Sequence, residues 1–442
     1  MPQVFVADAV LTLDAEAHFY QPGYLVLEQG QIIEVGSADS LSPARSAGAV
    51  YLPKRLVMPG LVNAHTHTPM VLFRGIAEGH SLFTFEGWYN SIRIIEYVAD
   101  ADMVPAAVAV SCAEMIRTGT TCFADQYFYM DKVLPVVNRS GMRAILSYGI
   151  VDEKDDEKTA REIAAAADFL RQAQGDPLIT PWLGPHALFE DNTVETILQE
   201  LPLAGQYGAG FHIHMLTDTG EDDYCKKHFG RSAAEEMVHL GVLQHPVLAA
   251  HCVQLQESDM PLLAQTPFTA VTCSSAAMRS GAGAAPVKAM LAHGVNVAIG
   301  TDNVANANAY DLFLEMNLTA KLASHREGQP EAVPARKIVE MATLGGARGM
   351  GLADKIGSLE PGKQADLIAL DLDAVGWAPF AGQDVYTALV YALTGQSVTD
   401  VMVAGNWLLR EGQWTTLDYR KARLELEDYR LELQRRIEKL DA

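Results

Sequence analysis

The sequence is short of basic residues, of cysteine pairs and of long apolar runs. Lysine and arginine number 33 against 55 aspartates and glutamates, which gives a net charge of −22. Nucleic acids and anionic membranes would repel a surface of this sign, so we expect neither as a partner. No run of eighteen apolar residues occurs, and the N-terminus lacks a basic segment followed by an apolar core. We therefore expect no membrane span and no signal peptide.

Five cysteines are spread over 442 residues without a repeating spacing and without a Cys-x-x-Cys pair. An odd, irregular set favours reduced thiols in a cytoplasmic protein over a disulfide framework. Redox sensing through Cys252 or Cys273 has little support, because buried cysteines are usually inert packing residues.

The central part of the chain alternates between short apolar runs and helix-length amphipathic stretches. Such alternation over about 300 residues favours parallel strands with crossover helices, and eight strands make a barrel more natural than an open sheet. We therefore predict an α/β fold, a distorted (β/α)8 TIM-like barrel, over residues 58–355. The expected strands are 58–63, 120–124, 143–150, 179–184, 210–214, 246–251, 268–272 and 295–301.

The two ends of the chain have a different pattern of predicted secondary structure. Segments 1–57 and 356–415 are rich in short β-prone runs, separated by turn residues such as Gly30 and Gly405. We predict that they pair with each other in a small β-sandwich domain beside the barrel. Residues 416–442 form a strongly helical tail of mixed charge, which predicts a surface helix, with a contact between subunits as the alternative.

Candidate chemistry begins at the end of the first central strand, with His65 and His67. Side chains alternate along a strand, so residues i and i+2 point the same way and both histidines can reach one metal ion. His214, His251 and Asp302 each follow a further apolar run. Because the carboxyl ends of barrel strands meet at one face, these side chains can form a single site there.

Imidazoles and one carboxylate are suitable ligands for a divalent ion. Held with one position open, such an ion binds a water and lowers its pKa towards neutrality, which is the chemistry of hydrolysis. Only one histidine of the second His-x-His pair, His212 or His214, is needed to complete the set. Taken singly, His251 or Asp302 could instead be a satisfied polar group of the core.

Nine ordered sequence blocks cover nearly the whole chain apart from the last helix. They are PGLVNAHTHTPMVLFRG (59–75), GTTCFAD (119–125), GMRAILSYGIVD (141–152), GPHA (184–187), HIHM (212–215), LAAHCV (248–253), AAPVKAML (284–291), IGTDN (299–303) and LEPGKQADLIALD (359–371). Together they resemble the amidohydrolase superfamily, specifically its 5′-methylthioadenosine/S-adenosylhomocysteine deaminases and s-triazine (atrazine-type) hydrolases.

The resemblance implies a mononuclear metal site with His65, His67, His214 and Asp302 as ligands. Zn²⁺, one per chain, is the expected metal and Fe²⁺ the alternative. In such enzymes the strand-8 aspartate, here Asp302, helps to deprotonate the water and later hands the proton to the leaving group. The strand-6 histidine, here His251, orients the attacking hydroxide and stabilises the tetrahedral adduct.

The resemblance also suggests which residues contact the substrate. His186 in the GPHA block would touch the ring, as would Trp88 and Glu86 in the loop after the first strand. Glu96 falls near the position where nucleoside deaminases of this group contact ribose hydroxyls, although the intervening loop differs in length. The remaining candidates are Tyr148, Thr217 and Asn303.

Three positions depart from the family pattern. Thr217 stands where the family usually has a glutamate that protonates a ring nitrogen, and a threonine cannot supply that proton at neutral pH. Either Asp218 reaches in, or the substrate needs no such proton, or deamination is lost. After strand 7, residues 272–277 replace the His-Asn-Pro of the deaminases. Tyr148 stands where some nucleoside deaminases have a substrate-binding arginine.

The predicted function is metal-dependent hydrolysis at a substituted carbon of a nitrogen heterocycle, with loss of ammonia from a purine, pterin, pyrimidine or triazine-like ring. Displacement of chloride or an alkylamine is the first alternative, because chloride leaves without a proton and s-triazine chlorohydrolases share the Thr-Asp-Asn of 301–303. A non-catalytic metal-binding relative is the second. The expected partners are a small heterocyclic substrate and further copies of the chain, as a dimer or tetramer.

Overall fold

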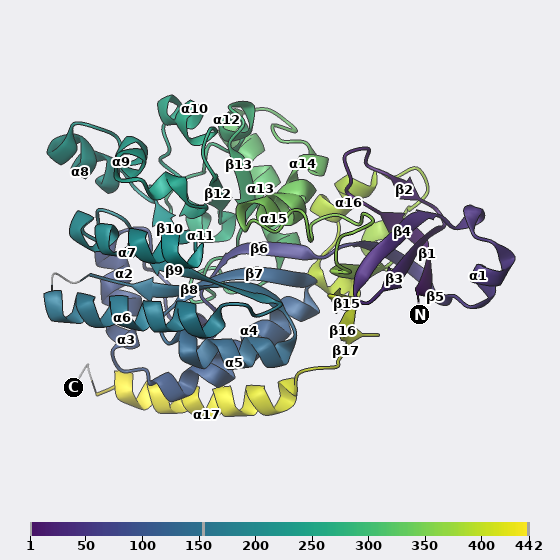
Figure 1. Ribbon diagram of the computed structural model, residues 1–442, viewed down its shortest axis with the longest axis horizontal. Helices are drawn as coiled ribbons and strands as arrows, with labels where there is room; N and C mark the ends of the chain where they lie inside the picture. The colour runs from purple at the N-terminus through teal and green to yellow at the C-terminus, as the bar shows by residue number, and fades with distance from the viewer. Residues whose placement is uncertain (1, 153–154, 440–442) are drawn as a thin grey trace.

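The computed structural model describes residues 2–152 and 155–439, which form a barrel with a separate mixed sheet at one side (Figure 1). The barrel sheet has eight strands in the order β13-β12-β11-β10-β9-β8-β7-β6, and neighbouring strands are parallel. The prediction of an α/β fold with a TIM-like barrel is therefore confirmed. The strands are β6 (Leu61–Thr66), β7 (Thr120–Tyr127), β8 (Arg143–Ile150), β9 (Ile179–Pro185), β10 (Phe211–Met215), β11 (Val247–His251), β12 (Phe268–Thr272) and β13 (Asn296–Ile299).

The first barrel strand differs from its predicted bounds of 58–63. Strand β5 (Val50–Pro59) belongs to the mixed sheet, and β6 begins only at Leu61. Gly60 separates the two, and a Cβ on it would lie 2.1 Å from Oγ1 of Thr121, so no larger residue fits there. The predicted strand ran across Gly60 because the residues on both sides of it are buried and apolar.

Helices surround the barrel strands (Figure 1). Side-chain caps start several of them: Asp155 accepts hydrogen bonds from the amides of Glu157 and Lys158 at α6, and Ser232 with Glu235 forms a capping box at α9. The helices that accompany the barrel are α2 (Phe85–Trp88), α3 (Ile94–Glu96), α4 (Val104–Arg117), α5 (Met130–Ser140), α6 (Asp156–Ala173), α7 (Val194–Tyr207), α8 (Gly220–Phe229), α9 (Ala233–Leu240), α10 (Met260–Leu263), α11 (Ser274–Arg279), α12 (Val287–Ala292), α13 (Leu312–Glu327), α14 (Ala335–Glu340) and α15 (Gly346–Gly349).

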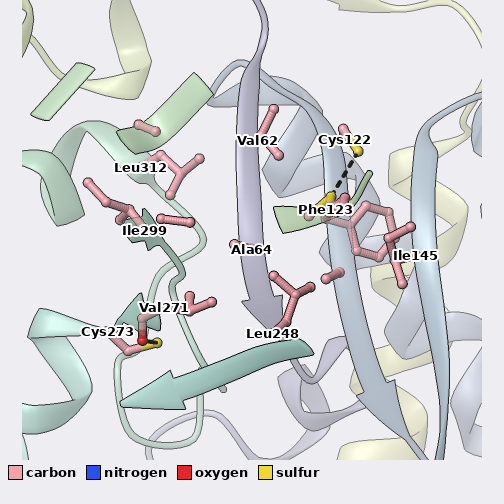
Figure 2. Packing of buried hydrophobic residues seen from close by; sticks show 14 of the residues in the cluster. Val62, Ala64, Cys122, Phe123, Ile145, Leu248, Val271, Cys273, Ile299 and Leu312 are labelled. Carbon is pink, nitrogen blue, oxygen red and sulfur yellow. Dashed lines mark hydrogen bonds between the residues drawn. The ribbon is translucent and has the colours of Figure 1, made fainter. Parts of the chain in front are cut away.

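Side chains of the barrel strands form a continuous apolar core. Val62 and Ala64 of β6 lie beside Phe123 of β7, with Leu248 of β11 and Ile299 of β13 nearby, and all five are fully buried (Figure 2). Parallel strands covered on both faces read as nearly unbroken apolar runs, which explains why the sequence located them well.

Polar contacts between β6 and the segment after β13 close the barrel at its carboxyl end. Asn63 donates from Nδ2 to Oγ1 of Thr301 at 2.8 Å and accepts from the Thr301 amide at 3.0 Å. The amide of Asp302 donates to the carbonyl of His65 at 3.0 Å. The strand-8 aspartate is thus held directly against the strand that carries the first histidine.

The mixed sheet joins strands from both ends of the chain. At its centre β5 pairs in parallel with β1 and antiparallel with β14. Segments separated by about 300 residues therefore share one hydrogen-bonded sheet, in the order β17-β16-β15-β14-β5-β1-β3-β4 with β2 beside β1. Its other strands are β1 (Gln3–Leu11), β2 (Phe19–Tyr20), β3 (Gly23–Glu28), β4 (Gln31–Ser37), β14 (Leu367–Asp371), β15 (Val398–Val403), β16 (Asn406–Arg410) and β17 (Gln413–Trp414), with α1 (Pro43–Ala47) and α16 (Val385–Tyr391) alongside.

A buried ion pair links the barrel to this sheet. Arg143, the first residue of β8, donates from Nε to Oδ2 of Asp366 at 2.9 Å and from Nη2 to Oδ1 at 3.1 Å. Both side chains are almost completely buried. The second carboxylate oxygen also accepts from the amide of Ala404, so one carboxylate connects β8 with two segments of the mixed sheet.

Helix α17 (Tyr419–Ile437) ends the described chain and lies along the barrel beside α4 (Figure 1). Arg430 donates to the carbonyl of Leu72, and Arg436 donates to the carbonyl of Val98. The helix therefore ties down both the segment that follows the first histidine pair and the segment that leads into α4. Across the described residues, none of the helices combines the length and apolar character needed to span a membrane.

Candidate active site

Four side chains predicted as metal ligands converge at the carboxyl end of the barrel. One ligand atom from each of His65, His67, His214 and Asp302 lies within 4.8 Å of the others, and all four residues are buried. Nε2 of His67 is 3.2 Å from Nε2 of His214 and 3.4 Å from Oδ1 of Asp302. Tetrahedral ligands bound at about 2.0–2.1 Å lie about 3.3 Å apart, so the spacing suits one small divalent ion.

Backbone carbonyls orient two of the histidines. His67 donates from Nδ1 to the carbonyl of Gln126 at 2.6 Å, and His214 donates from Nδ1 to the carbonyl of His186 at 2.8 Å. A carbonyl can only accept, so each Nδ1 carries the proton and each Nε2 presents its lone pair to the cluster. Outer contacts of this kind fix the tautomer that metal ligation requires.

The environment of His65 shows whether the cluster suits a metal ion. Its Nε2 is buried without a hydrogen-bond partner among the described residues, and it lies 3.5 Å from Oδ1 of Asp302. Burial lowers the pKa of His65 to about 4, so the ring is neutral near pH 7. A buried neutral imidazole with an unused lone pair, facing a carboxylate and two further lone pairs, is a divalent-metal site by its donor chemistry.

Asp302 is the negatively charged member of the cluster. Burial alone would raise the pKa of its carboxyl, but the neighbouring imidazoles of His65, His67 and His251 outweigh burial and hold that pKa well below its ordinary value. Its backbone has a positive φ of 60°, which is sparsely populated for a residue other than glycine. Oδ1 also accepts from the amide of Asn303 at 2.6 Å and from its Nδ2 at 2.9 Å. The carboxylate is therefore ionised and rigidly oriented.

His251 ends β11 beside the cluster without belonging to it. Its ring stacks on that of His214 at 5.3 Å and contacts Phe83 at 4.3 Å. Burial lowers the pKa of His251 to about 3, and its Nδ1 has no hydrogen-bond partner within the described chain. The neutral ring is free to hydrogen-bond a reacting oxygen, which fits the role predicted for it.

A cavity of about 550 Å³ opens above the cluster. Volumes in this range are typical of small-molecule sites. The structure brings together there most of the predicted site residues: His67, Trp88, Glu96, His186, His214, Thr217, His251, Asp302 and Asn303 all line it. Helix-borne Glu86 is exposed and is not among the lining residues, so the structure does not bring it to the cavity.

Two aromatic groups stand as a pair on the cavity wall. The ring of Trp88 stacks on that of His186 at 4.8 Å, and His186 lies 4.5 Å from the ring of His214. Nδ1 of His186 is 2.6 Å from Oδ2 of Asp191. Burial lowers the pKa of His186, but the charge and hydrogen bond of Asp191 outweigh it and raise that pKa above its usual value.

Glu96 lies between this cavity and a second one of about 260 Å³, and it lines both. Its carboxylate pairs with Arg93 at 3.2 Å, and the two side chains are nearly buried. Tyr148 lines only the second cavity, where its hydroxyl donates to Glu162 at 3.1 Å. Tyr148 is thus set apart from the metal cluster, on the far side of Glu96.

Thr217 and Asp218 follow β10 on another wall of the main cavity. Oδ1 of Asp218 accepts from the amide of Gly220 at 2.7 Å, so this carboxylate is engaged in its own turn. Cys252 and Cys273 are buried, and burial raises the pKa of both thiols. Protonated buried thiols are unreactive, which removes the physical basis for redox sensing there.

Gln126 and Glu190 were not predicted from the sequence, and His212 was considered only as the alternative to His214. His212 lies on β10 two residues before His214, and Gln126 donates from Nε2 to the carbonyl of His212 at 2.7 Å. The i, i+2 rule that was applied to His65 and His67 could have placed His212 inside the barrel as well. Glu190 lines the cavity from the loop after β9, and nothing in the local sequence distinguishes it from a surface glutamate.

Comparison with known proteins identifies the relatives of this chain. The amidohydrolase family model matches residues 56–408. The chain is 36% identical to the 5′-deoxyadenosine deaminase of Methanosarcina acetivorans over 431 residues, covering 95% of this chain and 96% of that protein. It is 37% identical to the 5-methylthioadenosine/S-adenosylhomocysteine deaminase of Moorella thermoacetica over 400 residues, covering 90% and 92%.

Solved structures give the same result for the fold. The crystal structure of a zinc-bound adenosine deaminase from Xanthomonas campestris matches with a TM-score of 0.88 and 29% identity over 98% of both chains. The zinc complex of an atrazine chlorohydrolase from Arthrobacter aurescens matches with a TM-score of 0.86 and 20% identity, over 97% of this chain and 99% of that one. The second likeness bears on the fold alone.

Proposed function

The chain belongs to the amidohydrolase family and is a hydrolase of C–N bonds, and we propose that its substrate is an adenine nucleoside altered at the 5′ position, from which it releases ammonia. The observation that carries this proposal is the arrangement of two cavities around Glu96. The metal cluster lies at one cavity, Glu96 lines both, and the second is lined by apolar side chains such as Leu72 and Met103 together with charged ones such as Lys158. A base over the metal, ribose hydroxyls at Glu96 and a small apolar 5′ group beyond it would fill this space in order.

The names of the relatives support the same class of substrate. Two deaminases of adenine nucleosides modified at the 5′ position align over nine-tenths or more of both chains. Tyr148 lines the second cavity with its hydroxyl engaged by Glu162.

The residues of the main cavity have separate tasks in this reaction. A divalent ion held by His65, His67, His214 and Asp302 would supply hydroxide at neutral pH. Asp302 accepts the proton of the attacking water and delivers it to the departing amine. Neutral His251 hydrogen-bonds the oxygen that becomes negatively charged as the tetrahedral adduct forms.

The wall of the cavity holds the ring. Trp88 offers a flat aromatic face, and His186, whose pKa Asp191 raises, can donate a hydrogen bond to an acceptor nitrogen. Asn303 also lines this space, where an amide side chain suits polar atoms of a heterocycle. These contacts would orient the amino-bearing carbon towards the metal cluster.

Displacement of chloride or an alkylamine from a triazine-like ring is the second candidate. The observation in its favour is Thr217, because chloride departs without accepting a proton and no acid is then required at that position. A non-catalytic relative is a weaker case, since a binding protein would have no evident need for Asp302 and His251 beside a metal.

We also propose Zn²⁺ as the metal, one per chain, with Fe²⁺ as the alternative. Three imidazoles and a carboxylate suit zinc, and a related adenosine deaminase was crystallised with zinc bound. A dimer or tetramer and a cytoplasmic location remain predictions from the sequence and its relatives.

A substrate panel tests the proposal. Metal-loaded protein is incubated with adenosine, 5′-deoxyadenosine, 5′-methylthioadenosine, S-adenosylhomocysteine, guanine and a chlorinated triazine, and ammonia, chloride and bound metal are measured together. We expect ammonia from the adenine nucleosides, with the highest kcat/KM for the 5′-deoxy or 5′-methylthio compound. Chloride release without ammonia would support the second candidate, and no product at one metal per chain would refute both.

A variant of Glu96 examines the ribose contact. Glu96→Gln should lower kcat/KM for nucleosides by about 10-fold or more while leaving the smaller rate on free adenine within about two-fold, since only the ribose hydroxyls lose a charged acceptor. Glu157→Gln, an exposed glutamate on α6, is the matched control. Equal losses on nucleoside and free base would contradict the assignment.

A further inference from the structure

The loop between β9 and α7 carries a carboxylate that the reaction described above does not use. Glu190 lines the main cavity together with Thr217 and Asp218. Its Oε1 is 3.7 Å from the point where a Cβ of Gly220 would stand, so it sits beside the turn that follows β10. Two walls of the cavity, from consecutive barrel strands, therefore meet at this side chain.

Hydrogen bonds and a left-handed turn fix the conformation of the loop around Glu190. Phe189 has a positive φ of 68° and a buried ring, a backbone conformation that is sparsely populated for residues other than glycine. Its amide donates to the carbonyl of Asn192 at 2.9 Å, and Asn192 donates from Nδ2 to the carbonyl of Ile150 at 3.0 Å. Asp191 accepts from the amide of Ala187 at 3.0 Å. The turn at Phe189 buries the aromatic ring and leaves Glu190 at the cavity.

Other carboxylates of the cavity wall are already engaged. Glu96 pairs with Arg93, Asp191 pairs with His186, and Asp218 accepts from the amide of Gly220. Glu190 has no hydrogen bond or ion pair with any residue in the described part of the chain. Among these wall carboxylates, Glu190 is therefore the one without a protein partner in the described chain.

The site described so far lacks an acid that can protonate a ring nitrogen of the substrate. Addition of hydroxide to an aminated ring carbon places negative charge on the neighbouring ring nitrogen, and a positioned acid stabilises that charge by protonating it. Thr217 cannot do this, and Asp302 and His251 already act on the attacking water and on the oxygen of the adduct. We propose that Glu190 is the catalytic acid that protonates the ring nitrogen of the substrate, in place of an acid at position 217. This inference rests on the proposed aminohydrolase function.

The protons balance in this scheme. Glu190 gives its proton to the ring nitrogen as the C–O bond forms, and Asp302 takes a proton from the attacking water. The C–N bond then breaks, the amine accepts the proton of Asp302 and leaves as ammonia, and the hydroxyl proton of the adduct returns to Glu190 through solvent. The products are the ring lactam and ammonia, with both carboxyl groups restored.

The surroundings of Glu190 favour a protonated acid. Glu190 is an exposed residue, but partial desolvation of its carboxyl by the cavity wall and the charges of Asp218 and Asp191 raise its pKa to about 7. The group that opposes this rise is cationic His186. Glu221 of α8 is close enough for its own pKa to be raised by Glu190. Near neutral pH a large share of Glu190 therefore carries the proton that the reaction needs.

Two substitutions and their combination test the assignment. Glu190→Gln should lower kcat/KM for the best adenine nucleoside by about 10²–10⁴-fold and remove the fall in rate above about pH 7, because an amide cannot give up a proton. Thr217→Glu placed in the Glu190→Gln protein should recover at least about ten-fold of the loss. Glu195→Gln, an exposed glutamate of α7, controls for the loss of one negative charge nearby.

Two readouts do not depend on turnover. The Kd of the lactam product should change by less than about three-fold in Glu190→Gln, because the product already carries its ring proton. Infrared difference spectra of wild type minus Glu190→Gln should show a carboxylic-acid band that disappears as the pH rises through about 7. Tight product binding with lost turnover separates a catalytic acid from a residue that merely shapes the cavity.

Failure of this inference and failure of the proposed function give different results. An active wild type with unchanged rate and pH profile in Glu190→Gln would overturn the role of Glu190 and leave the aminohydrolase intact. A metal-loaded wild type that releases no ammonia from any aminoheterocycle would overturn both. Loss of product binding in Glu190→Gln would also overturn the assignment, because it would show a structural role.

Discussion

Nδ1 of His65 lies 2.7 Å from Nε2 of His212 in a fully buried contact between β6 and β10. Nδ1 of His212 in turn lies 3.3 Å from Oγ of Ser147 on β8. With Nε2 of His65 facing the ligand cluster, the proton of His65 sits on Nδ1, which donates a hydrogen bond to Nε2 of His212. Hydrogen bonds among His65, His212 and Ser147, on three different strands, therefore set the tautomer and the orientation of one metal ligand.

Replacement of His212 by phenylalanine should weaken metal binding without removing a ligand. Loss of the acceptor for Nδ1 frees His65 to rotate or to change tautomer, and contacts of this kind are worth about 10–100-fold in metal affinity. Competition with a chromophoric chelator measures the zinc Kd directly. His325→Gln, at an exposed position of α13, is the control. An unchanged Kd in His212→Phe would contradict this role of His212.

The metal-free protein should lose stability as the pH falls below about 6.5. Burial lowers the pKa of His65 to about 4, whereas a histidine of the unfolded chain titrates near 6.5. Between these values the unfolded chain binds more protons, so folding is favoured fully above pH 6.5 and less as pH drops towards 4. The loss from this residue is at most about 3 kcal/mol. Urea unfolding of metal-stripped wild type and His65→Gln at several pH values measures it, and parallel curves would argue against a neutral buried His65.

The Arg143–Asp366 pair should matter far more than a surface pair. Asp366→Ala leaves a buried guanidinium without its partner and should cost about 3–5 kcal/mol, while the double variant Arg143→Met/Asp366→Leu should recover much of that loss. Lys54→Met, which breaks the exposed pair of Lys54 with Asp373, should cost no more than about 1 kcal/mol. Thermal unfolding ranks the variants. Equal effects of Asp366→Ala and Lys54→Met would show that this contact does not hold the mixed sheet to the barrel.

The barrel was largely predictable because its strands are covered on both faces. Continuous apolar runs such as 143–150 reveal buried parallel strands, and β8 has the bounds that were predicted for it. The run through Gly60 was misread for the same reason, since strands of two different sheets are buried there in succession. The close approach to Thr121 that requires a glycine depends on packing that local sequence does not encode.

The ligand cluster was predictable from strand ends, but its supports were not. The i, i+2 spacing of His65 and His67 predicts that they lie on one face of a strand, whereas the roles of His212 and Gln126 depend on which strands become neighbours. Glu190 is harder still, because its position results from a left-handed turn at Phe189 and from the proximity of Gly220. Contacts between residues far apart in sequence decide these roles, and a single sequence gives no signal for them.

The most direct test of the account compares ammonia release by metal-loaded wild type and Asp302→Asn on the best adenine nucleoside, with bound metal and unfolding temperature measured on the same samples. We expect one ammonia per nucleoside consumed by the wild type, loss of that activity on chelation, and its return with about one metal per chain. Asp302→Asn should fall by at least about 10³-fold with an unfolding temperature close to that of wild type, because a charge and a proton carrier are lost while the fold remains. Retained turnover in Asp302→Asn, or in metal-stripped wild type, would contradict it.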